Sequence, residues 1–262
     1  MPMTVNLHTH TFRCSHAKGT ERDYIERALA NGITRMGFAD HAPFAFPDGS
    51  EEWYRVPMAQ ATEYVSTLRA LREEYRDRIE ILIGFEMEYY PTYFADMRRI
   101  AADVGAEYLI LGQHHVEYQE NGEVKLFYSG KATDSAALLK GYVDEALEAM
   151  GTGAFTYMAH PELIRYEGDE AIYEREMRRL CQGASEMDIP LEINFLGLRE
   201  NRHYPIRRFW QWAKEYNCRV VFGCDAHDPM SAYDAESLAV AESWVKELAL
   251  RLEPNPPIRS IY

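Results

Sequence analysis

Short runs of apolar residues, rich in β-branched and aromatic side chains, recur along the chain and predict seven strands. They lie near residues 3–8, 34–40, 79–86, 107–114, 155–160, 190–195 and 218–225. Their apolar character is continuous rather than alternating, which is typical of parallel strands covered on both faces. Segments with apolar residues at helical spacing lie between these runs.

We expect the first helix to begin at Thr20 and six further helices to cover about 57–77, 92–104, 134–150, 169–187, 205–216 and 232–250. Thr20 and Asp23 form a near relative of the capping box at the start of the first helix. Strand–helix alternation of this kind predicts an α/β fold with a parallel sheet built from right-handed βαβ units. A doubly wound sheet and a closed barrel both satisfy the pattern.

No Pro/Gly/Ser linker, internal repeat or charge block divides the chain, so we expect a single domain over residues 1–262. Two connections from a strand to the next helix are long, 42–56 and 116–133. The second contains Asn121-Gly122 between strand-like arms, which predicts a β-hairpin. Long loops after strands are the usual place for substrate walls.

The composition excludes some classes of function for this protein. The 262 residues include 28 Lys and Arg against 42 Asp and Glu, a formal net charge of −14. Such a surface repels phosphate backbones, so we expect no nucleic-acid groove. No apolar run approaches the ~20 residues of a membrane span, and no signal peptide is apparent. The four cysteines form no CxxC pair, which favours a reduced, cytoplasmic protein.

Eight of the nine histidines lie at or just beyond the carboxyl ends of predicted strands, and only His203 lies elsewhere. With the acidic residues at the same ends, the metal-capable set is His8, His10, His16, Asp40, His41, Glu86, Glu88, His114, His115, His160, Asp225 and His227. The carboxyl ends of parallel strands meet on one face of a barrel or sheet, where active sites form. The distribution therefore predicts one shared site.

The spacing of these residues favours metal binding. Residues i and i+2 of a strand point the same way, so His8 and His10 can bind one ion together, as can Asp225 and His227. Imidazole nitrogen with carboxylate oxygen suits Zn, Mn or Fe. Seven histidines, one Glu and one Asp exceed the ligands of one tetrahedral ion and fit two or three ions, with the Glu as a bridge.

Several motifs occur in the order seen in the PHP (polymerase and histidinol phosphatase) superfamily. They are HTHTFRCSHAKG, GFADHAPF, GFEMEYYP, LILGQHH, MAHPELIRY, EINFLGLRENRHYP and GCDAHDP. From His8 to about Pro229 the chain resembles the monofunctional histidinol-phosphate phosphatases of that superfamily. The resemblance implies a distorted seven-stranded β/α barrel, TIM-like, with a trinuclear metal site.

The resemblance also implies how the ligands are shared. His8, His10, Glu86 and Asp225 would hold the first ion, Glu86, His114 and His160 the second, and His16, His41 and His227 the third. The superfamily has one ligand histidine after its fourth strand, whereas two adjacent ones occur here. Neighbouring strand residues face opposite sides, so only one of the two can point at the metal ions. Counted from Tyr108, His114 falls where the superfamily ligand is expected, so the resemblance implies His114, with His115 as the alternative.

The activity implied is hydrolysis of L-histidinol phosphate to L-histidinol and phosphate, a step of histidine biosynthesis, by a hydroxide that bridges two metal ions. Glu86, Asp225 and His227 are the candidate catalytic residues, through the ions they hold. Arg165 and Arg199 resemble phosphate-contacting arginines of the phosphatases. Arg202 is a third candidate for this contact.

The leaving group of such a substrate carries an ammonium and an imidazole, which need carboxylate or aromatic partners. Glu88, Tyr90, Glu117 and residues of the 42–56 loop are the candidates. Three alternatives stay open: a PHP phosphoesterase acting on another small phosphate ester or nucleotide, an amidohydrolase-type enzyme, and a non-catalytic metal-binding module. The oligomeric state is not predicted.

Overall fold

The computed structural model describes residues 3–262, and one parallel sheet runs through them. Its strands, in spatial order, are β1 (Val5–Asn6), β2 (Arg35–His41), β3 (Glu80–Met87), β4 (Tyr108–Leu111), β7 (Phe155–Met158), β8 (Leu191–Asn194), β9 (Arg219–Gly223) and β10 (Arg251–Leu252). Strands β1–β4 and β7–β9 are the seven that the apolar runs predict. The two-residue strand β10 was not expected.

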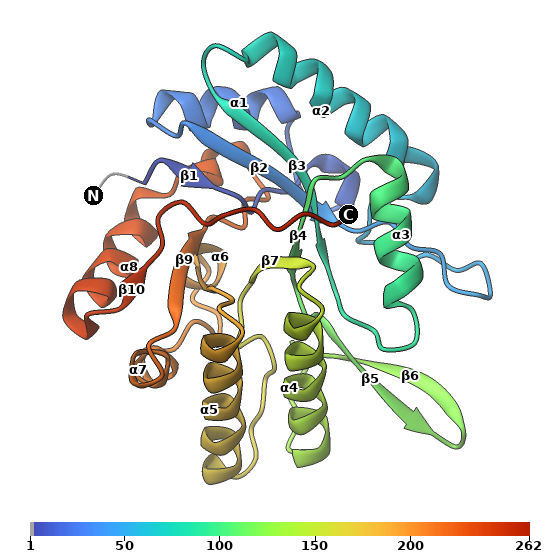
Figure 1. Ribbon diagram of the computed structural model, residues 1–262, viewed down its shortest axis with the longest axis vertical. Helices are drawn as coiled ribbons and strands as arrows, with labels where there is room; N and C mark the ends of the chain where they lie inside the picture. The colour runs from blue at the N-terminus through green and yellow to red at the C-terminus, as the bar shows by residue number, and fades with distance from the viewer. Residues whose placement is uncertain (1–2) are drawn as a thin grey trace.

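The sheet curls into a distorted barrel (Figure 1), as expected. At the carboxyl end the chain beyond β1 meets the chain beyond β9, where Thr9 and Ala226 form a parallel bridge and the backbone N–H of His10 donates to the carbonyl of Ala226 at 3.0 Å. At the opposite end β10 pairs with the start of β9. The barrel therefore closes directly at its carboxyl end, where the metal-capable residues lie.

Helices cover the outer side of the curled sheet (Figure 1). The helices of residues 3–262 are α1 (Glu21–Ala30), α2 (Ala61–Tyr75), α3 (Phe94–Val104), α4 (Ala136–Gly151), α5 (Glu170–Glu186), α6 (Phe195–Arg199), α7 (Arg207–Glu215) and α8 (Ala235–Leu248), with 3₁₀ turns η1 (Phe12–Cys14), η2 (Met58–Gln60) and η3 (Pro229–Ala232). Thr20 and Asp23 make both bonds of the predicted capping box. The five-residue helix α6, which begins directly after β8, was not predicted from the sequence.

The connection after β4 contains the predicted β-hairpin, formed by β5 (His115–Glu120) and β6 (Glu123–Tyr128). Asn121 and Gly122 at its turn have φ values of 52° and 80°. Positive φ at both central residues matches the twist of a two-residue hairpin. The hairpin extends away from the barrel (Figure 1), and its first and last residues, His115 and Tyr128, line the cavity described below.

Two apolar clusters build the core. The larger lies between the sheet and its helices, and the smaller fills the barrel interior with side chains that include Leu7, Tyr108 and Tyr157. A Cβ at Gly37 or Gly84 would come within 2.4 Å of the Tyr108 ring or its hydroxyl. These two glycines therefore leave the space that the ring fills beneath the site.

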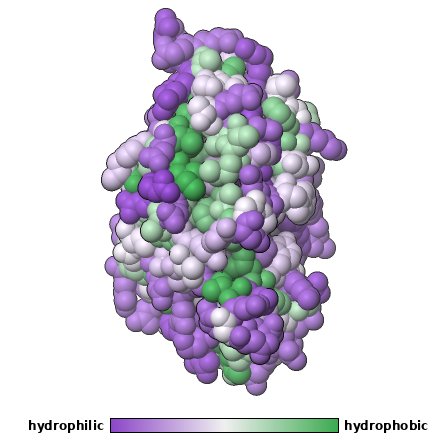
Figure 2. Space-filling model, turned by 90° about the vertical axis from the view of Figure 1, so that its right-hand side faces the viewer, coloured by the Kyte–Doolittle hydropathy of each residue, from purple (hydrophilic) through white to green (hydrophobic). Residues whose placement is uncertain are grey.

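Few large apolar side chains reach the surface. Figure 2 shows the side with α2, α3 and the hairpin, where hydrophilic residues surround limited apolar patches. Among residues 3–262, no helix is both long enough and apolar enough to cross a membrane. All four cysteines are buried and free.

Candidate metal centre

The first group of predicted ligands meets where the barrel closes. The Nε2 atoms of His8 and His10 lie 3.2 Å apart. The Oδ1 atom of Asp225 is 3.6 Å from the first of them and 3.3 Å from the second. The i, i+2 spacing thus directs both imidazoles to one point, as the sequence analysis expected.

Glu86, near the end of β3, occupies the centre of the site and is 1% exposed. Ring nitrogens within 3.5 Å of its carboxylate belong to His8, His10, His41, His114 and His160. Its Oε2 atom faces His8 and His10, whereas Oε1 faces His114 at 3.5 Å and His160 at 2.7 Å. One carboxylate therefore faces two separate sets of imidazoles, which is the geometry of a bridge.

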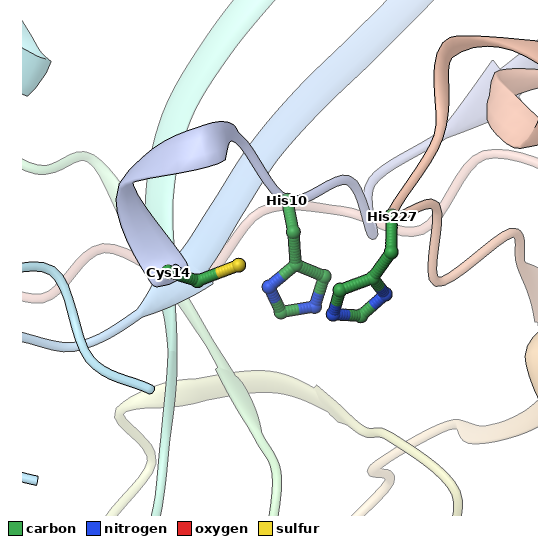
Figure 3. A group of neighbouring side chains, drawn as sticks. All are labelled: His10, Cys14 and His227. Carbon is green, nitrogen blue, oxygen red and sulfur yellow. The ribbon is translucent and has the colours of Figure 1, made fainter. Parts of the chain in front are cut away.

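A third group combines segments that are far apart in the sequence. One nitrogen each of His16, His41 and His227 lies within 4.8 Å of the other two. Figure 3 shows that the thiol of Cys14 also points toward His10, beside His227. Burial raises the pKa of this thiol, but hydrogen bonding to His10 and His16 lowers the pKa by a larger amount, so the net shift is downward. Cys14 was not among the metal-capable residues predicted from the sequence.

The two adjacent histidines after β4 point to different places. The Nε2 atom of His114 faces Glu86, as described above. His115 points to the cavity wall instead, where its Nδ1 atom lies 3.4 Å from the hydroxyl of Tyr54 and 3.3 Å from that of Tyr90. Of the two, His114 is thus the one placed among the other predicted ligands.

Carboxylates behind the imidazoles contact the ring nitrogens that face away from the centre. The Nδ1 atom of His8 lies 2.8 Å from Glu192, that of His10 lies 3.5 Å from Asp40, and that of His114 lies 3.1 Å from Glu88. Such partners fix the tautomer and orientation of ligating histidines. Asp40 and Glu88, both marked as metal-capable in the sequence, lie in this outer layer.

Glu192 lies among the predicted ligands, although the sequence did not predict it there. Its Oε2 atom accepts hydrogen bonds from the backbone N–H of His160 at 3.1 Å and from the side chain of Asn194 at 3.0 Å. Asn194 also donates to Asp225 at 3.0 Å. A polar pair at i and i+2 within an otherwise apolar strand is the signal that could have revealed them.

The backbone is unusual at two predicted ligands. His160 and Asp225 have φ values of 30° and 45°. Residues other than glycine rarely adopt positive φ, and such conformations cluster at functional sites, where the surrounding structure holds them. Each lies two residues beyond a strand, β7 and β9 respectively, so the turn out of the strand directs each side chain at the centre.

Burial and neighbouring charges set the protonation of the cluster. Burial raises the pKa of Glu86 and Asp225, but the surrounding imidazoles lower it by a larger amount, so each net pKa is well below its usual value. Burial and the nearby His10 lower the pKa of His41 and His227 well below the usual value. Burial lowers the pKa of His8 and His10, but contacts with the neighbouring carboxylates raise it by more, so each net pKa is well above its usual value. Metal ions bind charged carboxylates and neutral imidazoles, so an ion bound by His8 and His10 would displace protons from them.

Unpaired polar atoms show that this donor set fits cations. Glu86 Oε2, Asp225 Oδ1, His41 Nδ1 and His227 Nε2 are buried without a hydrogen-bond partner among the described residues. Buried polar atoms almost always have partners, and unpaired ones call for an explanation such as an ion. Nitrogen and oxygen donors in this number suit more than one transition-metal ion.

A cavity of about 500 Å³ opens above the cluster. Besides predicted ligands, its lining includes Trp53, Tyr54, His115, Tyr128, Leu163, Leu196, Glu200, Arg202 and Tyr204. This size is typical of a site for one small molecule. Trp53 and Tyr54 come from the 42–56 loop, as expected for a substrate wall, whereas Glu88 and Tyr90 are fully buried.

The three candidate arginines lie at different positions. Arg202 lines the cavity and pairs with Glu200 at 2.7 Å. Arg199 pairs with Asp234 at 2.9 Å and lines an adjoining groove that also contains His16 and His227. Arg165 is not among the cavity-lining residues and pairs with Glu167 at 2.7 Å.

His203, the histidine set apart in the sequence, lies outside the cluster. Its Nε2 atom lies 2.9 Å from the carbonyl oxygen of Leu163. Burial lowers its pKa. This contact is structural, in keeping with its position away from the strand ends.

Comparison with known proteins places this geometry in a family. The PHP domain family matches residues 6–195, nearly three quarters of the chain. The chain belongs to the PHP family. A histidinol-phosphatase of Bacillus subtilis is 27% identical, with 87% of this chain and 96% of that protein covered. A probable histidinol-phosphatase of Deinococcus radiodurans is 25% identical, with 85% of each chain covered.

A solved structure supports the same fold. Histidinol phosphate phosphatase from Lactococcus lactis, crystallised with zinc, L-histidinol and phosphate, superposes with a TM-score of 0.70 at 16% sequence identity. The match covers 99% of this chain and 97% of that one. PHP membership agrees with the resemblance found in the sequence motifs.

Proposed function

We propose that this protein is a metal-dependent phosphatase that hydrolyses L-histidinol phosphate to L-histidinol and phosphate. The observation that carries the proposal is the Glu86 carboxylate, whose two oxygens face separate groups of imidazoles at the closed end of the barrel. Family membership and the histidinol-phosphatase relatives support the choice of reaction and substrate.

Two or three divalent ions, Zn, Mn or Fe, fit the donors. His8, His10, Glu86 and Asp225 would hold the first, Glu86, His114 and His160 the second, and His16, His41 and His227 the third. When bound, such ions neutralise phosphoryl oxygens and lower the pKa of water so that it can attack phosphorus. Glu86, Asp225 and His227 therefore act by holding positive charge close to the phosphate.

The chain's own residues bind and orient the ester. Arg202 lines the cavity and Arg199 lines the adjoining groove, so both can supply guanidinium contacts to an incoming phosphate. Arg165 lines neither and would have to leave Glu167 to make such a contact. Leu163, Leu196 and the aromatic rings of the wall exclude water around it. Local positive charge of this kind accommodates a phosphate despite the net charge of −14.

Aromatic side chains suit the rest of the substrate. Trp53, Tyr54 and Tyr128 line the cavity, and rings of this kind attract cations such as an ammonium or imidazolium. Glu200, which also lines the cavity, adds a carboxylate. A leaving group with an ammonium and an imidazole is therefore favoured over a neutral one, such as a sugar or a nucleoside.

A substrate panel tests the proposal. The metal-loaded protein is offered histidinol phosphate, p-nitrophenyl phosphate, a sugar phosphate and a nucleoside monophosphate, and released phosphate is measured. We expect the highest kcat/KM for histidinol phosphate. Turnover of histidinol phosphate no faster than that of p-nitrophenyl phosphate would show that another ester is the substrate.

A further inference from the structure

A buried ionic network lies behind the cavity wall and joins the 42–56 loop to the centre. Arg55, near the end of this loop, is 1% exposed. One of its guanidinium nitrogens lies 2.9 Å from Glu88 Oε2, and Nε donates to Glu52 at 2.7 Å. The guanidinium also donates to the carbonyl of Ala42 at 3.1 Å. A single charged group therefore connects both ends of the loop with β3.

Glu88 continues this connection inward. Its Oε1 atom accepts a hydrogen bond from the hydroxyl of Tyr54 at 3.1 Å and lies 3.1 Å from His114 Nδ1. An ionised carboxylate can only accept, so the proton of a neutral His114 belongs on Nδ1. The lone pair then lies on Nε2, the atom that faces Glu86.

Burial of the Arg55–Glu88 ion pair costs free energy, which indicates that the pair has a function. Removing two charges from water is expensive, and apolar residues of similar volume often stabilise a core as well as an ion pair does. Glu162 offers a contrast, because this buried carboxyl accepts a hydrogen bond from the backbone N–H of Ile206 at 2.8 Å instead of contacting an imidazole. The Arg55–Glu88 pair differs from Glu162, because Glu88 contacts the imidazole of His114, a predicted metal ligand.

We propose that Arg55 and Glu88 are positioning residues that hold His114 as an Nδ1–H tautomer, with Nε2 presented to a metal ion. Through the same contacts, the ion bound by His114 and the docked position of the 42–56 loop stabilise each other. The inference rests on the metal centre of the proposed function and not on the identity of the substrate.

Zinc affinity provides the first test. Zinc-loaded protein is equilibrated with a series of chelator-buffered zinc concentrations, and bound zinc per chain is measured. Glu88→Gln and Arg55→Met are expected to weaken one zinc by about 10–100-fold, the usual effect of losing an outer-shell partner. The matched control Glu162→Gln makes the same substitution at another buried carboxyl and should bind zinc as the parent does.

The tautomer supplies a readout that a merely structural role would not change. Long-range ¹H–¹⁵N spectra of the zinc-loaded protein, labelled at histidine, should show His114 protonated at Nδ1 in the parent. Glu88→Asp keeps the charge for Arg55 but withdraws it from the imidazole, so it provides a variant that folds if Glu88→Gln does not. We expect this signal to shift in Glu88→Asp and to persist in Glu162→Gln.

The outcomes separate this inference from the proposed function. Unchanged zinc affinity and an unchanged His114 signal in folded Glu88 variants would overturn the positioning role alone. Equal zinc loss in Glu162→Gln would also overturn it, because the effect would then be general to buried carboxyls. A folded parent protein that binds no divalent ion would overturn the metal centre itself.

Discussion

Gly112, directly after β4, offers a steric test of the bridging role of Glu86. A Cβ at this position would lie 2.1 Å from Glu86 Oε1 and 2.5 Å from Cγ and Cδ of the same side chain. Ordinary contacts of a Cβ begin at about 3.4 Å, so the carboxylate of a Gly112→Ala variant must retreat by more than about 1 Å. Metal–ligand distances tolerate only about 0.2 Å.

The predicted consequence is weaker metal binding with a moderate loss of stability. We expect about 10–100-fold lower affinity for at least one ion and a comparable fall in kcat/KM, as for other disturbed metal ligands. Overpacking of this kind costs about 1–3 kcal/mol of folding free energy. Bound metal after dialysis against chelator, phosphatase kinetics and thermal unfolding measure the three effects.

Gly151, the last residue of α4, provides the matched control. The nearest atom to a Cβ there is Met187 Sδ at 3.8 Å, an ordinary contact. Gly151→Ala should keep its metal and its activity, with stability unchanged or raised by up to about 1 kcal/mol. Gly112→Ala protein that retains the parent's metal affinity and kcat/KM would refute the reasoning about Glu86.

Other substitutions test separate parts of the account. Asp225→Asn removes a charged ligand from the first group, so metal content should fall and phosphatase activity should drop by about 100-fold or more; full activity would contradict the assignment. Arg202→Ala should raise KM for the phosphate ester by about 10-fold in steady-state kinetics, since a charge-assisted contact contributes about 1.5–3 kcal/mol. An unchanged KM would show that Arg202 does not contact the phosphate. Burial raises the pKa of Glu162 well above its usual value, so its contribution to stability is complete below that usual value and is lost as the pH rises through the folded-state pKa. As the pH rises above the usual glutamate range, urea unfolding should therefore show a smaller loss of stability for Glu162→Gln than for the parent. Parallel curves would argue against a protonated Glu162.

The sequence was sufficient to predict where the metal-capable residues meet. Apolar runs locate the strands, and the carboxyl ends of parallel strands share one edge, so His8, Glu86 and Asp225 could be brought together without knowledge of their contacts. The choice of His114 over its neighbour came from the resemblance to the superfamily, because alternation alone says only that one of the two faces the site. The hairpin followed from Asn121-Gly122, since few other turns suit that dipeptide.

Features that depend on tertiary contacts could not be predicted in this way. Glu192 lies within an apolar strand, and only the fold shows that it reaches the imidazole of His8. Arg55 looks like an ordinary loop residue until the 42–56 loop is folded over Glu88. The pairing of β10 with β9 and the closure through Thr9 and Ala226 likewise depend on the curvature of the sheet.

A metal titration followed by phosphate release tests the central claim most directly. Metal-depleted, folded protein is titrated with Zn or Mn, and bound ions per chain and hydrolysis of histidinol phosphate are measured in the same samples. We predict that two or three ions bind per chain and that activity rises with their occupancy. A folded protein that binds these ions without releasing phosphate, or that releases phosphate equally well without them, would contradict the account.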